Sequence, residues 1–487
     1  MRQLLKDSAF FSASRYFILG LGFVRNLVIA KFLSPTAYGA WVFITLVLTY
    51  GDQVHLGLRH LGDKEIPYRR GRGEATVDFA NTIYGGVIIF SIVAFLLLTA
   101  YAFFNSGIDE NTKFGIYLAS GIILADQVNR FYYMILRAHQ EFVLASKIES
   151  LAEILRTLLL AVGVILFELP GALVGMVLSA LLLAAYFGWR YRLTYRPQWQ
   201  WRTLAELFRL GLPLFITGAL FILLSNADRL AIALRLSAHD LGLYGLVALL
   251  VAVPFNAVQA LGFVIFPRLS EQFGRHGQAS MLEPFFSKIL TAAVLFTPPL
   301  VTSVFLATPA VITGFLPAYV EAIPLALVLL PGVYFFTIVQ LPSLFLIAVE
   351  RTRRYIVIEF VMLVVMMMSY FVGFKMAPNR ITVAGVTAIS FFFLTTLLLL
   401  TCYKTAGYSL AGRFKTIAKI YLPFLFSLVW LALLFKIFPY HPMSSFSPSL
   451  LWSLRHLTLY LIVYGAIVVW AMQRHGYWSR LRMELIN

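Results

Sequence analysis

The sequence predicts an all-α protein that crosses a membrane many times, and two observations predict this class. The 487 residues are 60% hydrophobic and only 13% charged, and the mean hydropathy of +0.83 lies far above that of soluble globular proteins. The apolar residues also gather into stretches of about 20, which is the length that a helix needs to cross a bilayer. Most of the chain is therefore expected to lie in lipid.

About fourteen such stretches follow one another along the chain, and each is expected to form one transmembrane helix. They lie near residues 10–31, 38–59, 78–104, 114–136, 147–167, 171–190, 210–234, 241–266, 285–307, 322–347, 356–375, 381–403, 419–436 and 454–472. The polar segments between them are too short to fold as soluble domains. Any activity is therefore expected to come from the helix bundle itself.

An internal repeat divides the predicted helices into two groups. The sequence NLVIAKFLSPTAYG at residues 26–39 is similar to RLAIALRLSAHDLGLYG at residues 229–245, because an apolar helix end, a serine turn and a Tyr-Gly pair recur. Chance similarity between two leucine-rich helix ends is the alternative explanation. A duplicated unit of six helices would give both copies the same orientation, a parallel repeat, because six is an even number.

The repeat predicts four segments along the chain. They are an N-terminal six-helix lobe, a cytoplasmic and interfacial linker, a C-terminal six-helix lobe, and two additional transmembrane helices with a cytoplasmic tail, over residues 1–190, 191–209, 210–403 and 404–487 respectively. In the linker, Trp and Leu alternate with polar residues, which suits a segment at the membrane surface.

Lys and Arg residues collect at every second end of the predicted helices. If the N-terminus is inside the cell, that side holds about 27 of them and the outside about 7, and basic loops resist translocation. This distribution predicts a multi-pass protein with both termini in the cytoplasm. The net charge of +17 does not indicate nucleic-acid binding, because the basic residues interrupt apolar segments and do not cluster on a soluble face.

Charged and amide side chains lie deep within several predicted helices of the N-terminal half and in the seventh helix. In the first helix, Arg15 and Asn26 lie about 20° apart on a helical wheel, and Arg25 lies about 80° away. The substrate-binding candidates are Arg15, Arg25, Asn26, Arg130, Arg156 and Arg229, and the candidates for ion coupling or counter-charge are Asp52, Asp126, Glu149, Glu153 and Asp228. The last six predicted helices carry almost no charge at depth.

Charges in hydrocarbon are costly and usually face the interior of a bundle or a water-filled cavity. We expect the arginines to give one cavity between the lobes cationic walls, and guanidinium groups grip phosphate bidentately. The predicted ligand is therefore an anionic head group. The alternative is that the opposite charges only neutralise one another as contacts between helices.

The sequence contains no HExxH, Walker A, GxGxxG or GxSxG motif, and its eight histidines lack metal-ligand spacing. Its single cysteine, Cys402, cannot form a disulfide within the chain. We therefore expect no soluble-type catalytic site, no metal and no cofactor. A multispan glycan polymerase or glycosyltransferase is the alternative from the enzyme class, and the short outer loops argue against it.

Two segments resemble the polysaccharide flippases of the multidrug/oligosaccharidyl-lipid/polysaccharide exporter superfamily. The first is LLKDSAFFSASRYFILGLGFVRNLVIAKFLSPTAYGAW, which is similar to the family's first helix and the turn after it. The second is LGLPLFITGALFILLSNADRLAIALRLSAHDLGLYG, which is similar to the family's seventh helix. The matching positions are Leu33, Ser34, Pro35, Tyr38 and Gly39 in the turn, and Asp228 and Arg229 in the seventh helix.

The resemblance implies a transporter of the bacterial inner membrane that works by alternating access between two bundles. Its substrate would be an oligosaccharide on undecaprenyl pyrophosphate, such as an O-antigen or exopolysaccharide repeat unit, and the arginines would hold the pyrophosphate. A proton or sodium gradient would drive transport, as in an antiporter. The other partners implied are membrane lipids, a polysaccharide polymerase and chain-length proteins. Lipid II flippases and, third, drug exporters of the same superfamily are the alternatives.

Overall fold

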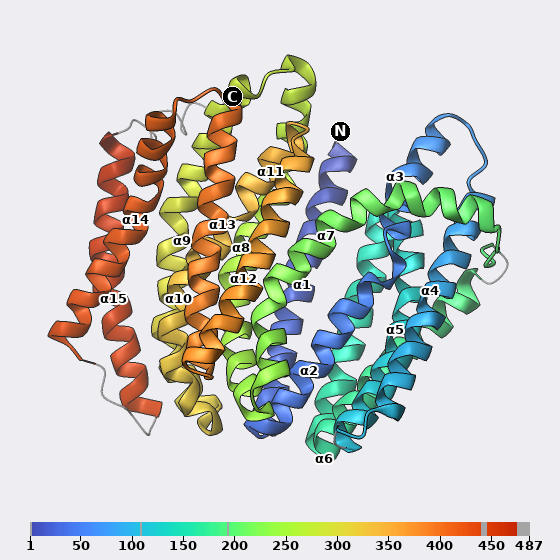
Figure 1. Cartoon of the computed structure of the whole chain (residues 1–487), viewed down its shortest axis with the longest axis horizontal. Coiled ribbons are helices and arrows are strands. Elements are labelled where there is room, and N and C mark those ends of the chain that lie inside the picture. Colours follow the sequence, from blue (N-terminus) through green and yellow to red (C-terminus); the bar gives the residue numbers. More distant parts are fainter. Residues whose placement is uncertain (1, 108–109, 192–193, 440–445, 475–487) are drawn as a thin grey trace. The chain divides into compact units, whose positions relative to one another are not determined.

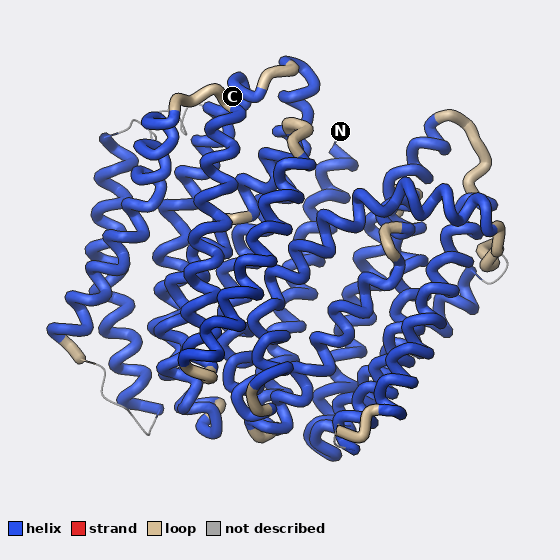
Figure 2. Tube along the Cα trace, in the orientation of Figure 1, coloured by secondary structure: helices blue, strands red, loops and turns tan. Residues whose placement is uncertain are grey.

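The structure is a computed structural model that describes residues 2–107, 110–191, 194–439 and 446–474 (Figure 1). These residues form helices joined by short loops, and no strand occurs among them (Figure 2). The all-α prediction is therefore confirmed. The expected cytoplasmic tail after Arg474 lies outside the described residues.

Each apolar stretch of the sequence falls on one helix or on directly joined helices. In chain order the elements are α1 (Arg2–Phe32), α2 (Pro35–Gly51), η1 (Asp52–His55), α3 (Leu58–Gly71), α4 (Val77–Phe104), α5 (Glu110–Ala138), α6 (Phe142–Tyr191), α7 (Trp201–Arg235), α8 (Ala238–His276), α9 (Ala279–Phe315), η2 (Pro317–Ala322), α10 (Ile323–Ile338), α11 (Gln340–Ala348), α12 (Thr352–Met376), α13 (Arg380–Thr405), α14 (Leu410–Ile437) and α15 (Phe446–Arg474). The two η elements are 3-10 turns.

Fewer helices pass a length and hydropathy test for a membrane span than the fourteen that the sequence predicted, and α6, which contains two of those fourteen, counts once among them. Among the described residues, 10 helices are long and apolar enough to cross a membrane, and 11 if the bent pair Pro317–Leu329 and Gly332–Ala348 counts as one span. The count of fourteen is therefore not confirmed. Helix α2 falls short because it has only 17 residues.

Helix α6 covers 50 residues, but it is a hairpin of two helices. Its backbone leaves the helical conformation at Phe167 and Glu168. A Cβ on Gly171 would lie 2.0 Å from the Gly163 carbonyl oxygen, and one on Gly175 would lie 2.6 Å from that of Leu159. These contacts run in opposite directions along the chain, so the two halves are antiparallel. The fifth and sixth predicted helices are both present in α6.

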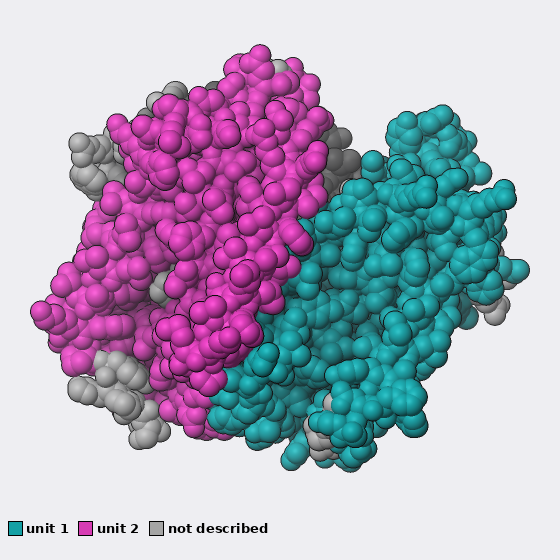
Figure 3. Space-filling model, viewed as in Figure 1, with its two compact units in different colours: residues 1–245 teal, residues 246–487 magenta. Residues whose placement is uncertain are grey.

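The chain divides into two compact units, residues 1–245 and residues 246–487 (Figure 3). The border lies within α8, and α7 packs against α2, α3 and α4 of unit 1. The predicted lobes stay a prediction.

In unit 1, α1 packs along α6, and α5 packs against both α4 and α6. Aromatic rings fill the space between α4, α5 and α6: Tyr84 stacks on Phe131 with ring centroids 4.3 Å apart, and Tyr132 stacks on Phe187 at 5.1 Å. In unit 2, α10 packs on α13, and α9 packs on α14 and α15. Both units thus have an apolar interior of their own.

The two repeated serine turns lie against each other within unit 1. The Ser34 Oγ accepts a hydrogen bond from the Ala37 amide at the start of α2, and the Ser237 Oγ accepts one from the Asp240 amide at the start of α8. A Cβ on Gly39 would lie 1.8 Å from the Ala238 carbonyl oxygen, and one on Gly242 would lie 1.9 Å from that of Pro35. The two turns therefore contact each other reciprocally, because a glycine near the start of each helix lies against the carbonyl oxygen of the first residue of the other helix.

Candidate anion-binding site

Two ion pairs between predicted site residues join α1 to α6. The Arg15 Nη1 lies 2.8 Å from the Glu149 Oε1, and Arg25 pairs with Glu153. Glu149 and Glu153 are one helical turn apart, so they lie on the same face of α6. That face packs along α1, which carries both arginines.

A second set of ion pairs surrounds Asp52, at the point where α2 ends and the 3-10 turn η1 begins. The Asp52 Oδ1 lies 2.8 Å from the Arg130 Nε on α5 and 2.9 Å from the Arg59 Nη2 on α3. The Gln127 amide group donates to the main-chain oxygens of Gly51 and Asp52, at 3.1 and 3.0 Å. One carboxylate at a break between helices thus holds two guanidinium groups.

A third pair connects the first two sets. The Arg156 Nη2 on α6 lies 3.4 Å from the Asp126 Oδ1 on α5. Arg130 interacts electrostatically with Asp126 and with Glu149 as well as with Asp52. The charged candidates of α1, η1, α5 and α6 therefore form one network within unit 1.

The arginines of this network differ in how far they reach solvent. The side chains of Arg15 and Arg130 are 47% and 50% exposed, whereas those of Arg25 and Arg59 are 16% and 9% exposed. Arg130 contacts Asp52 through Nε, and its two terminal nitrogens donate no hydrogen bond to the residues that the structure describes. Arg15 and Arg130 can therefore accept an anion, whereas Arg25 and Arg59 are enclosed with their acids.

The candidates on α7 form a separate group. The Asp228 Oδ2 accepts a hydrogen bond from the Tyr244 hydroxyl at 2.8 Å. The Arg229 Nη2 donates to the Ser225 carbonyl oxygen at 2.7 Å, and its Nε lies 3.6 Å from Asp228. In the described part of the chain, no ion pair joins Arg229 to the network of α1, η1, α5 and α6.

The candidate Asn26 has partners on both sides of its amide. Its Nδ2 donates to the Gly22 carbonyl oxygen at 2.8 Å, and its Oδ1 accepts a hydrogen bond from the Trp41 indole at 3.3 Å. Asn26 therefore connects α1 to α2 through a hydrogen bond in this conformation.

Sequence reasoning missed Arg59 and Gln127 as site residues. Arg59 is seven residues after Asp52, which in a continuous helix would place both on one face, and this spacing was the available signal. Nothing in the sequence indicated Gln127, because its role depends on the main-chain oxygens that the break at Gly51 leaves free.

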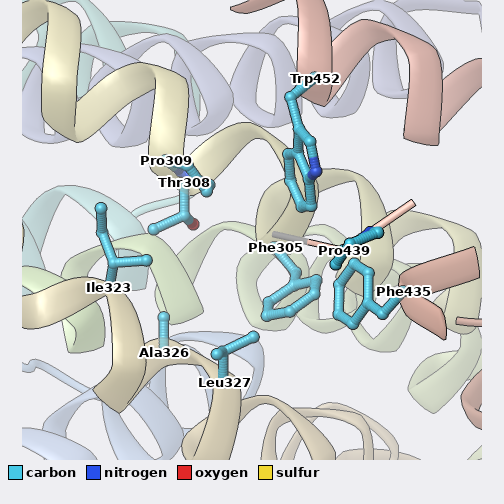
Figure 4. Close-up of a pocket in the computed structure, with 9 residues that line it drawn as sticks. All are labelled: Phe305, Thr308, Pro309, Ile323, Ala326, Leu327, Phe435, Pro439 and Trp452. Atoms are coloured by element: carbon cyan, nitrogen blue, oxygen red, sulfur yellow. The ribbon is translucent and has the colours of Figure 1, made fainter. Parts of the chain in front are cut away.

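The apolar cavities of unit 2 differ from this site in chemistry. One of about 150 Å³ lies between α9, α10, α14 and α15 (Figure 4). Its lining includes Phe305, Leu327, Phe435 and Trp452 but no charged residue. It does not suit an anionic head group. Among the described residues, no group of His, Cys, Asp and Glu side chains could hold a metal ion.

A polytopic helical bundle with an arginine and carboxylate network inside its spans is typical of a membrane transporter. The fold is that of solved transporters. The lipid II flippase MurJ in an inward closed conformation matches with a TM-score of 0.70 and 14% identity, over 94% of this chain and 99% of MurJ. An inward-facing multidrug resistance MATE family transporter of the MOP superfamily matches with a TM-score of 0.60 and 14% identity, over 80% of this chain and 94% of that one.

The Vibrio cholerae MATE transporter VcmN, in a mutant form, matches with a TM-score of 0.57 and 16% identity, over 83% of this chain and 96% of that one. No curated protein matches the sequence significantly. The chain belongs to the polysaccharide biosynthesis protein family, whose model matches residues 4–273, more than half of the chain. The predicted relationship to a polysaccharide-related family is therefore confirmed.

Proposed function

We propose that the chain flips an undecaprenyl-pyrophosphate-linked oligosaccharide across the bacterial inner membrane by alternating access. The repeat unit of an O-antigen or exopolysaccharide is the proposed glycan. The observation that carries the proposal is the pair of half-exposed arginines, Arg15 and Arg130, each held by an acid and each with donor groups to spare. Family membership supports the link to polysaccharide, and the transporter fold supports movement across a membrane.

The network can exchange one anion for another. A guanidinium binds a phosphate through two parallel hydrogen bonds, and a hydrogen bond to a charged group contributes about 1.5–3 kcal/mol net. A pyrophosphate would therefore compete with Asp52 for Arg130 and with Glu149 for Arg15 at a small difference in free energy. Small differences of this kind favour reversible binding, which a transport cycle requires.

The carboxylates that lose an arginine would need another cation. Asp52, Asp126, Glu149, Glu153 and Asp228 are the proposed acids for this role, and a proton or a sodium ion is the proposed cation. Ion binding would then be coupled to substrate binding through shared arginines.

The test is movement of a labelled polyprenyl-pyrophosphate glycan between leaflets of liposomes that contain the purified full-length chain. We expect Arg15→Ala and Arg130→Ala to slow movement about tenfold or more, which corresponds to about 1.4 kcal/mol, and Arg130→Lys to retain part of the rate. The matched control is Arg380→Ala, because Arg380 pairs with Glu321 at 3.1 Å outside the network. Wild-type rates in both arginine variants would overturn the assignment.

The same assay separates the alternatives. Lipid II as the better substrate would assign the chain to peptidoglycan synthesis, and a lengthened glycan in the products would assign it to polymerases or glycosyltransferases. The proposed topology places both termini in the cytoplasm, and the proposed partners are membrane lipids, a polysaccharide polymerase and chain-length proteins. Reporter fusions at each terminus test the topology.

A further inference from the structure

Unit 2 holds a carboxyl group to which the proposed function gives no role. Glu359 lies on α12 (Thr352–Met376), and it is 1% exposed. It belongs to a buried stripe with Tyr355, Met362, Met366 and Tyr370, whose spacing places them on one face of the helix. Helix α12 packs against α11 and α13, so this carboxyl group lies in the apolar interior of unit 2.

Only one oxygen of this carboxyl group has a hydrogen-bond partner. The Tyr355 hydroxyl donates to the Glu359 Oε1 at 2.5 Å. The Oε2 is buried and has no hydrogen-bond partner. Among the described residues, no Lys, Arg or His interacts electrostatically with Glu359. This setting differs from that of every acid of the unit 1 network, each of which faces at least one arginine.

An isolated carboxylate in an apolar interior costs several kcal/mol relative to water, and such groups take up a proton instead. A buried polar atom without a partner also costs about 1–3 kcal/mol. An ionisable residue within a membrane span that bears such costs is by default a functional group.

We propose that Glu359 is a proton-binding site, which loads and releases one proton in each transport cycle. The inference rests on the proposed function, since it names the proton as a coupling ion and adds a site for it within unit 2 to the proposed acids of unit 1. The proton occupies the Oε2, while the Oε1 accepts the hydrogen bond from Tyr355.

Tyr355 provides a route for the proton. Helix α12 begins at Thr352, beside the exposed side chains of Arg351 and Arg353, and Glu359 lies about 10 Å along the helix axis from that end. Tyr355 lies one turn before Glu359 and is also close to Ser343 on α11. On release, the carboxyl group turns so that its O–H donates to the phenol oxygen; that O–H bond then breaks and its proton passes to the phenol oxygen, while the phenol gives its own proton to water. The reverse sequence loads the site.

The first experiment measures the proton directly and does not depend on transport. Infrared spectra of the full-length chain in lipid nanodiscs contain one C=O stretching band for each protonated carboxyl group. At neutral pH we expect a band that Glu359→Gln removes and that Tyr355→Phe shifts, because the phenol donates to that group. Glu321→Gln is the matched control, since the Glu321 side chain is 65% exposed. An unchanged band in Glu359→Gln would overturn the proposal.

The second experiment measures coupling in liposomes. With wild-type protein, we expect a pH difference across the membrane to accelerate movement of the labelled polyprenyl-pyrophosphate glycan about tenfold. Glu359→Gln should lose the acceleration by the pH difference, and Glu321→Gln should keep it together with the wild-type rate. Acceleration by a sodium gradient alone, or full acceleration in Glu359→Gln, would contradict the proposal. If the wild-type chain moves no glycan under any condition, the proposed function fails, and the infrared band still decides whether Glu359 holds a proton.

Discussion

The helices of the two units are joined by different kinds of polar contact. In unit 1, ion pairs such as Arg15–Glu149 and Arg25–Glu153 connect the interiors of neighbouring helices. In unit 2, hydroxyl groups make the corresponding links. The Ser427 and Tyr460 hydroxyls lie 2.7 Å apart between α14 and α15, and the Thr395 hydroxyl donates to the Phe335 carbonyl oxygen at 2.9 Å.

The difference indicates that helices of this protein can pack without buried ion pairs. Unit 2 buries its helices with hydroxyl links and apolar contacts, and its pair Arg380–Glu321 lies at the start of α13 and in η2. A buried ion pair is often no more stabilising than apolar residues of the same volume. The charges of unit 1 therefore call for another explanation, and an anionic ligand provides one. Glu359 is the exception within unit 2.

The largest expected effect is on the enclosed pair of unit 1. Arg25→Ala would leave Glu153 as an unpaired buried charge, so we expect the free energy of unfolding to fall by about 3–5 kcal/mol. The double variant Arg25→Leu with Glu153→Leu should recover most of this loss. Denaturant unfolding in detergent, followed by helical circular dichroism, measures both. If Arg25→Ala lowers the free energy of unfolding by less than about 1 kcal/mol, the enclosed pair stabilises the protein no more than an exposed ion pair does.

The next effect is on the open part of the network. Arg130→Ala should weaken binding of a polyprenyl-pyrophosphate glycan by about 1.5–3 kcal/mol, which is about tenfold to 150-fold in Kd. Stability should change little, because Asp52 keeps Arg59 as a partner. Binding titrations of the purified chain give Kd, and the same titrations with Arg380→Ala provide the control. Equal Kd values for Arg130→Ala and wild type would refute the anion site.

A smaller effect is expected in unit 2. Tyr460→Phe removes the hydroxyl that pairs with Ser427, so the free energy of unfolding should fall by about 1 kcal/mol. The rate of glycan movement should stay at the wild-type value, since Tyr460 has no role in the anion site. A strong loss of transport at unchanged stability would mean that the hydroxyl links of unit 2 also serve function.

The smallest effect is expected at the half-exposed pair of α1 and α6. Glu149→Gln should change the free energy of unfolding by less than about 1 kcal/mol, because ion pairs near solvent contribute little. The difference between this loss and that of Arg25→Ala then measures how much more an ion pair contributes to the free energy of unfolding when it is enclosed. A loss as large as that of Arg25→Ala would show that the two pairs are equivalent.

Hydropathy predicted the fold class, because the cost of exposing the backbone to lipid leaves helices as the form that these stretches can take. It also predicted both halves of α6, since each half is long enough to be recognised by itself. The glycines at 171 and 175 allow the two halves to approach closely, because a Cβ at either position would collide with the first half of α6. Length and hydropathy do not reproduce the predicted number of spans, because α2 is short and α5 carries several charges.

Sequence reasoning identified the charged residues but not their partners. The pair Arg15–Glu149 spans 134 positions, and its formation depends on how α1 packs along α6, which a pattern within one helix does not reveal. Glu359 was not among the predicted site residues, because the last six predicted helices carry almost no charge and were not searched for single acids. The single acid in the run IVIEFVMLVVMMM was the available signal.

The contact between the turns at Gly39 and Gly242 has a consequence for motion. At the start of each helix, a glycine lies against the carbonyl oxygen of the first residue of the other helix, so the contact has local two-fold symmetry. A motion in which α2 and α8 turn by equal and opposite angles about an axis perpendicular to that symmetry axis keeps both halves of the contact equivalent. The first residues of these two helices can therefore swivel against each other while neither half opens ahead of the other.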